Sequence, residues 1–107
     1  MTATYWTPEA HARLADIEAY IAKDAPLVAK DVVARILARA RQLDTAPLSG
    51  RQLPDYRRED LRELLERPYR LIYRVTTERI EILTVMHYRQ LLPRKTSMLA
   101  KLTEDKP

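Results

Sequence analysis

The spacing of apolar residues changes its period once along this chain, and that change limits the folds open to it. Before residue 45 apolar residues recur every three or four positions, which is typical of amphipathic helices. After residue 60 they alternate or run continuously through β-prone stretches. Two helices followed by a run of strands predict an α+β fold, with the helices on one face of a small twisted sheet.

The first half of the chain predicts a short strand and two helices. Residues 3–6 are β-prone, and Thr7-Pro8-Glu9 is typical of a helix start, with Thr7 as the N-cap. Asp24-Ala25-Pro26 ends this helix and can begin another, so we expect an antiparallel pair. The apolar stripes are Ala10, Leu14, Ile17 and Ile21 in the first helix, and Val28, Val32, Ile36, Ala40 and Leu43 in the second, with Ala29, Val33 and Leu37 beside them.

Three β-prone stretches follow a loop at residues 45–60, which holds Gly50, the single glycine of the chain. They predict an antiparallel meander. The third stretch has apolar residues at both parities, as a central strand does. The stretches are Leu61–Leu65, Tyr69–Thr76 and Arg79–His87, separated by Arg67-Pro68 and by a tight turn at Thr77-Glu78.

Two arginines stand among the apolar residues of the second stretch. Its odd-numbered residues are apolar or aromatic and are expected to face the helices, with Tyr69 and Tyr73 in the core. Arg70 and Arg74 have the opposite parity. We therefore expect both arginines on the face of the sheet that the helices leave open.

Composition narrows the classes of function. The 107 residues fit one domain, with its core at about residues 3–93 and residues 94–107 as a tail or weak helix. Cysteine is absent and there are two histidines, so we expect no disulfide, no metal site and no cofactor. No apolar run reaches about 18 residues and the N-terminus lacks a secretion signal. We expect no membrane contact and a cytoplasmic location.

The net charge of +4 is concentrated in one segment. Residues 51–95 carry eleven basic and seven acidic side chains, and ten of the eleven are arginines, whereas residues 1–50 are balanced. Arginine suits phosphate or carboxylate, so the segment predicts an anion-binding surface or, as the alternative, a solvated basic face. Within it, Tyr56 lies in the basic loop and is the aromatic residue that we most expect to be exposed.

Several enzyme classes are excluded by missing motifs. The chain has no G-x-S-x-G, no cysteine nucleophile, no Walker loop and no dinucleotide-binding glycine pattern. Its closely spaced carboxylates interleave with arginines and are interpreted as surface ion pairs. These carboxylates are Glu59, Asp60, Glu63 and Glu66.

Metal-free RNA cleavage is the one catalytic hypothesis that the residues support. Arg70, Arg74 and Arg89 are able to stabilise phosphate, His87 to titrate near neutral pH, and Tyr88 to stack on a base or donate a proton. The set is incomplete because arginine does not serve as a base. The alternative for His87 is a hydrogen-bonded structural histidine.

A series of short landmarks occurs in one order along residues 3–93: Tyr5-Trp6-Thr7-Pro8-Glu9-Ala10, Ile17–Ile21, Pro47-Leu48-Ser49-Gly50-Arg51, Leu61-Arg62-Glu63-Leu64, Tyr69-Arg70-Leu71-Ile72-Tyr73-Arg74-Val75, and Ile80–His87 followed by Arg89. Each landmark is loose alone, but their order and spacing resemble the RelE/ParE superfamily of bacterial type II toxin–antitoxin toxins. The resemblance implies a helical hairpin on an antiparallel sheet.

The superfamily contains two activities. RelE-like members are ribosome-dependent mRNA endonucleases, and ParE-like members bind DNA gyrase, block it and trap broken DNA. Here the loop after Gly50 holds no lysine, Leu53 stands about where one nuclease subgroup has a glutamate, and no terminal His-Tyr pair follows. The resemblance therefore favours the ParE-like branch, with no catalytic residue. For an endonuclease the site would be Arg70, His87, Tyr88 and Arg89.

The ParE-like hypothesis implies two partners, DNA gyrase and a ParD-like antitoxin that forms a hetero-oligomer with the toxin. The endonuclease hypothesis implies the ribosome and mRNA instead. The residues expected to contact the target are Tyr56, Arg57, Arg58, Arg62, Arg70, Arg74, Arg89, Arg94 and Lys95.

The antitoxin is expected to fold against the helical hairpin, where the wide apolar stripe of the second helix suggests spare surface. The alternative is that this stripe packs entirely on the sheet. A third hypothesis, a small basic nucleic-acid-binding or adaptor domain, rests on the charge pattern alone. The residues expected to contact the antitoxin are Val28, Ala29, Val32, Val33 and Ile36.

Overall fold

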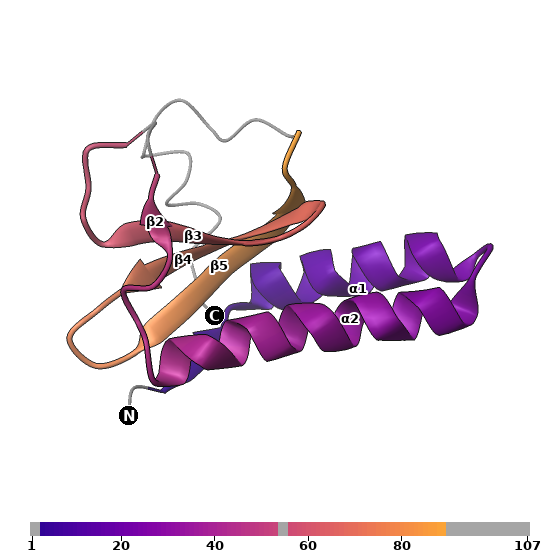
Figure 1. Ribbon diagram of the computed structural model, residues 1–107, viewed down its shortest axis with the longest axis horizontal. Helices are drawn as coiled ribbons and strands as arrows, with labels where there is room; N and C mark the ends of the chain where they lie inside the picture. The colour runs from indigo at the N-terminus through magenta and orange to yellow at the C-terminus, as the bar shows by residue number, and fades with distance from the viewer. Residues whose placement is uncertain (1–2, 54–55, 90–107) are drawn as a thin grey trace.

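Two antiparallel helices lie along one face of a five-stranded sheet in the computed structural model, which describes residues 3–53 and 56–89 (Figure 1). The predicted α+β class is confirmed. Neither helix in this part of the chain is long and apolar enough to cross a membrane. The elements are β1 (Thr4–Trp6), α1 (Pro8–Ala22), α2 (Pro26–Arg41), the 3-10 helix η1 (Gln42–Asp44), β2 (Arg51–Gln52), β3 (Leu61–Glu66), β4 (Tyr69–Val75) and β5 (Ile80–His87).

The strands lie in the order β1-β5-β4-β3-β2. The three long strands form the predicted antiparallel meander. β5 lies between β1 and β4, so it is an interior strand of the sheet, as expected. Two details differ from the sequence prediction. β1 runs parallel to β5, so the sheet is mixed, and β2 adds a two-residue strand inside the predicted loop. Strands this short leave too weak a pattern to predict the direction of β1 or the existence of β2.

A β-bulge in β5 explains why that strand is apolar at both parities. Ile72 pairs with Thr84, but its neighbour Tyr73 pairs with Ile82, so Leu83 is an extra residue on β5. The extra residue resets the alternation of side chains between the two faces of the sheet. Both faces of β5 are also covered, which removes the need for polar positions.

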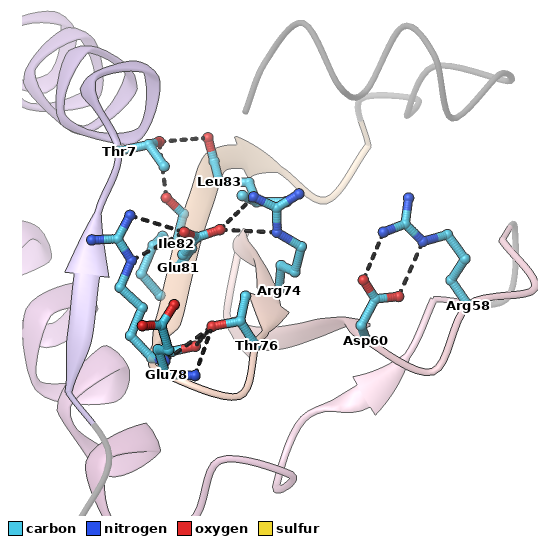
Figure 2. A network of polar contacts seen from close by, with 10 residues as sticks. Thr7, Arg58, Asp60, Arg74, Thr76, Glu78, Glu81, Ile82 and Leu83 are labelled. Atoms are coloured by element: carbon cyan, nitrogen blue, oxygen red, sulfur yellow. Dashed lines mark hydrogen bonds and ion pairs between the residues drawn. The ribbon is translucent and has the colours of Figure 1, made fainter. Parts of the chain in front are cut away.

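Thr7 fixes the start of α1 to this bulge. Its Oγ1 caps the helix by accepting a hydrogen bond from the Ala10 backbone N–H at 3.2 Å. The same hydroxyl lies 2.9 Å from the Ile82 carbonyl oxygen and 3.1 Å from that of Leu83, to which it donates (Figure 2). The buried N-cap therefore sets where the helical hairpin lies on the sheet.

The main core lies between the helices and the sheet, and it takes up most of the apolar stripe of α2. Ala29, Val32 and Ile36 are buried, and Val33 packs against the core. The expectation that this stripe keeps spare apolar surface is therefore wrong for the three buried residues. Val28, which is 52% exposed, lies outside the core.

A second, smaller core lies on the other side of the sheet, which we call the outer face. The expectation that Tyr56 is exposed is wrong, since it is 6% exposed and belongs to this core. The face was expected to be open because the helices cover the opposite one, but Leu53 and Tyr56, which come between β2 and β3 in the chain, pack on part of it. The outer core consists of Leu53, Tyr56, Leu61, Ile72 and Leu83, with Met86 packed against it.

Two predictions concern residues outside the part of the chain that the structure describes. They are the tail or weak helix at 94–107 and the target contacts Arg94 and Lys95.

Candidate functional site

The outer face holds a buried carboxylate between two arginines. The side chain of Glu63 on β3 has no exposed surface, and Arg70 on β4 donates from Nε to its Oε1 at 2.6 Å. Arg51, opposite Glu63 on β2, binds the second oxygen. The Arg70 side chain is itself only 11% exposed. Glu63 and Arg70 are thus largely removed from water, and each charge is tolerated there because the other neutralises it.

A second carboxylate on the same face is held in the same way. Glu81 on β5 lies directly opposite Arg74 on β4, whose Nε donates to Oε1 at 2.9 Å (Figure 2). Arg79 donates from Nε to Oε2 at 3.0 Å, and its guanidinium lies 4.1 Å from the centre of the Tyr5 ring. Each carboxylate therefore has one arginine on β4 and a second on a neighbouring segment.

These two clusters explain the arginines inside the sheet. Arg70 and Arg74 lie on the outer face, as the parity predicted, but both form ion pairs with carboxylates of this chain. The interpretation of Glu63 as a member of a surface ion pair is wrong, because its side chain is fully buried. Asp60 does form a pair near the surface, in which Arg58 binds both carboxylate oxygens at 3.0 and 2.6 Å (Figure 2).

Neighbouring arginines lower the pKa of two of these carboxylates, Glu81 and Asp60. Burial would raise the pKa of Glu81, but the hydrogen bonds from Arg74 and Arg79 outweigh it, so the pKa lies below its ordinary value. The hydrogen bond from Arg58 lowers the pKa of Asp60 against a smaller effect of burial. Both carboxylates are therefore ionised at neutral pH.

We predict that Glu81 makes folding stability depend on acid. Its folded-state pKa is lower than its unfolded one, so its contribution is present at neutral pH and is lost as the pH falls below about 4. In Glu81→Gln the pH dependence of the unfolding free energy should be shallower, by at most about 1.4 kcal/mol per pH unit. Urea unfolding measured from about pH 3 to about pH 7 follows this loss from its start at acid pH to the neutral reference. Glu78→Gln, at an exposed turn position without an ion pair in the described residues, should keep the wild-type slope.

The other predicted target contacts lie in different surroundings. Arg57 and Arg89 are exposed and have no acidic partner within residues 3–53 and 56–89. Arg62 pairs with Tyr73 and therefore lies on the side of the sheet that faces the helices. Its NH1 donates a hydrogen bond to the Gly50 carbonyl at 3.0 Å. Its Nε is buried and finds no hydrogen-bond partner in the described part of the chain. Arg57 and Arg89 are the candidates that remain available to a partner.

An aromatic cluster lies where β5 ends. The His87 ring stacks on the ring of Tyr88 at 5.1 Å between centres and meets Tyr69 edge-on at 6.0 Å. His87 Nδ1 accepts a hydrogen bond from the Arg89 backbone N–H at 3.2 Å. Tyr69 and His87 also line a groove of about 380 Å³ beside α1, together with Ile17 and the exposed Tyr20.

The structure does not bring the predicted nuclease residues together. Tyr69 pairs with His87 and Arg70 with Met86. Because successive side chains of a strand point to opposite faces, His87 lies on the helix side with Tyr69, whereas Arg70 lies on the outer face with Glu63. An acid–base residue and its phosphate-binding arginine would have to lie on one face.

Residues 5–92 match the sequence model of a family described as the ParE toxin of the type II toxin-antitoxin system parDE. This chain belongs to the ParE toxin family. The resemblance to the RelE/ParE superfamily, with the ParE-like branch favoured, is confirmed. The protein is a toxin of a type II toxin–antitoxin system.

Two relatives of this ParE-family toxin agree with that assignment. A protein of Sinorhizobium fredii, named "Putative toxin Y4kP", is 44% identical over 90 residues, which are 82% of this chain and 90% of the relative. A solved structure described as "Chromosomal ParDE TA system from P. aeruginosa" contains a chain of 28% identity. It aligns with a TM-score of 0.70 and covers 81% of this chain and 96% of that one.

The buried ion clusters were not predicted from the sequence, although a signal for them existed. A two-residue turn at Arg67-Pro68 places Glu63 opposite Ile72, diagonal to Arg70. The tight turn predicted at Thr77-Glu78 likewise places Glu81 opposite Arg74. Charges of opposite sign at such positions attract across a pair of strands. Working out the register of the hairpins would have predicted both pairs, but not their burial.

Proposed function

We propose that this ParE-family toxin acts by binding DNA gyrase, blocking supercoiling and stabilising the enzyme's cleaved-DNA complex. On this proposal catalysis belongs to gyrase, and the toxin contributes a binding surface. It acts in the cytoplasm, arrests growth and, when encoded on a plasmid, stabilises that plasmid. A ParD-like antitoxin neutralises it in a hetero-oligomeric complex. The similarity to a chain of the P. aeruginosa ParDE system supports this partner.

One structural observation favours gyrase over mRNA as the target of this toxin. The residues that an endonuclease would need are divided between the two faces of the sheet, with His87 on one and Arg70 on the other. Arg70 is moreover held by a buried carboxylate at 2.6 Å and is 11% exposed, so it is not available to a phosphate. Family membership favours the same choice.

The proposed target contacts are the basic residues that remain exposed and without an acidic partner in the described part of the chain. Arg57 comes directly after Tyr56, a residue of the outer core, and Arg89 comes shortly after the end of β5 at His87. Contacts of arginine with DNA or an acidic protein surface weaken as salt is added. We therefore expect inhibition of gyrase to be stronger at low ionic strength.

The test is DNA supercoiling by purified gyrase, with ATP and relaxed plasmid, as the purified toxin is titrated in. We expect loss of supercoiling and accumulation of linear DNA with covalently attached gyrase. The double variant Arg57→Ala, Arg89→Ala should need roughly tenfold more protein for half inhibition, if it loses about 1.4 kcal/mol of binding. Lys30→Ala, an exposed change on α2, is the matched control and should inhibit like wild type.

A folded, growth-arresting toxin that leaves supercoiling unchanged would contradict the proposal. Cleavage of ribosome-bound mRNA would then be the mechanism to test, with Arg70, His87, Tyr88 and Arg89 substituted in turn.

A further inference from the structure

The outer edge of β1 is open to a further strand. β1 ends the sheet, because β5 is its neighbour on one side and no described strand lies on the other. The Ala3 carbonyl accepts from the Ile80 N–H at 2.8 Å, and the Thr7 N–H donates to the Ile82 carbonyl at 3.1 Å. Because these groups alternate along a strand, the N–H and C=O of Thr4 and Trp6 point away from β5.

A groove runs beside this edge. It has a volume of about 510 Å³ and lies between β1 and the end of α2. The half-buried Trp6 and the α2 residues Leu37 and Ala40 form its apolar part. The same two β1 residues that present free backbone groups, Thr4 and Trp6, therefore also line the groove.

Charge at the groove favours an acidic ligand. Its two ionisable residues are Arg41 and Asp44. Asp44 is already engaged, since the Thr4 hydroxyl donates to its Oδ1 at 2.6 Å. Arg41 is exposed, and its side chain has no acidic or hydrogen-bonding partner within the described residues. A carboxylate lying in the groove would meet an unused positive charge.

The opposite edge of the sheet lacks this combination. β2 consists of two residues, Arg51 and Gln52, so that edge carries the positive charge of Arg51. Charged or proline residues are common devices that protect an edge from pairing with another chain. The edge of β1 carries neither, because its outward residues are Thr4 and Trp6.

We propose that β1 receives an extended segment of a protein partner, which adds a sixth strand to the sheet. The segment pairs with the backbone of Thr4 and Trp6, places an apolar side chain against Trp6 and Leu37, and offers a carboxylate to Arg41. Backbone pairing supplies affinity and the groove supplies specificity in this mode of recognition. The inference rests on the proposed function in one respect, that the partner is the antitoxin.

Two variants at one position test the backbone contact. Thr4→Pro removes the outward N–H, and Thr4→Val keeps it, while both lose the hydroxyl bound to Asp44. Proline is tolerated on an edge strand when its missing N–H faced solvent. Calorimetry with the purified cognate antitoxin measures the effect. We expect Thr4→Pro to weaken binding at least tenfold, roughly 1.4 kcal/mol, and Thr4→Val to change it less than threefold, roughly 0.7 kcal/mol.

A pair of charge variants tests the groove. Arg41→Glu should weaken antitoxin binding several-fold, whereas Lys30→Glu, an equal change of charge elsewhere on α2, should not. Equal affinities of the two Thr4 variants would overturn the inference. Circular dichroism identifies a variant that fails to fold.

Amide hydrogen exchange of the unmodified protein gives an answer that needs no variant. Antitoxin binding should slow exchange at Thr4 and Trp6, while Thr7, already bonded to Ile82, serves as the internal reference. Binding without new protection would overturn the edge contact and leave the antitoxin as partner. Protection in the free toxin that grows with its concentration would identify a second copy as the occupant instead. Absence of any antitoxin binding would overturn both proposals about that partner.

Discussion

Replacing Glu63 with alanine is expected to lower the free energy of unfolding by about 3–5 kcal/mol. The loss leaves Arg70, whose side chain is 11% exposed, buried without a counter-charge. Arg51 contributes little to this figure because its side chain is 65% exposed and solvent screens it. Urea denaturation followed by circular dichroism measures the change. For a domain of this size, one or two such losses approach the whole stability.

Two further variants separate the ion pair from simple loss of packing. Glu59→Ala, an exposed glutamate in the same segment, should change stability by less than about 0.5 kcal/mol. Replacing Glu63 and Arg70 together with methionine should cost less than Glu63→Ala alone, since no unpaired charge is then buried. A double variant as unstable as the single one would show that the pair is not the cause.

Gly50→Ala should be the other strongly destabilising change, by about 3 kcal/mol, the upper end of typical overpacking effects. A Cβ at this position would lie 2.4 Å from the Glu63 carbonyl oxygen and 2.6 Å from the Tyr73 hydroxyl. Neither can move aside easily, because one belongs to the backbone of β3 and the other to a side chain with no exposed surface. Glycine is needed here for close approach, since its φ is not positive.

The Tyr73 hydroxyl is the reason that the chain passes so closely. It accepts a hydrogen bond from the Gly50 N–H at 2.9 Å and donates to the Pro47 carbonyl at 2.9 Å. Burial raises the pKa of Tyr73, so the hydroxyl stays protonated and able to donate. Thermal unfolding of Gly50→Ala beside Ser49→Ala, an exposed neighbouring change, measures the effect. A Tm equal to that of Ser49→Ala would contradict it.

The candidate site was predicted less well than the fold. The parity of β4 correctly placed Arg70 and Arg74 on the face away from the helices. It gave no sign that Glu63 and Glu81 would occupy both arginines, because those contacts depend on the register between strands. Tyr56 was misplaced for a related reason. A polar loop gives no periodic signal, so the packing of Tyr56 on the outer face was not predictable from the residues around it.

The sequence by itself determined the elements and their order. Apolar period, the cap at Thr7 and the breaks at proline are local properties, and local properties are fixed by neighbours within a few residues. The landmarks Tyr5–Ala10 and Tyr69–Val75 likewise indicated the family, and the match of the family model over residues 5–92 confirmed it.

Only the tertiary structure decided which side chains are available to a partner. Burial and pairing depend on residues far apart in the chain, such as Arg70 with Glu63 and Tyr73 with Gly50. The parallel direction of β1 was also set by packing, since a strand of three residues has no sequence pattern that shows its direction. Charge and hydrophobicity can be counted along a sequence, but their exposure is a property of the folded surface.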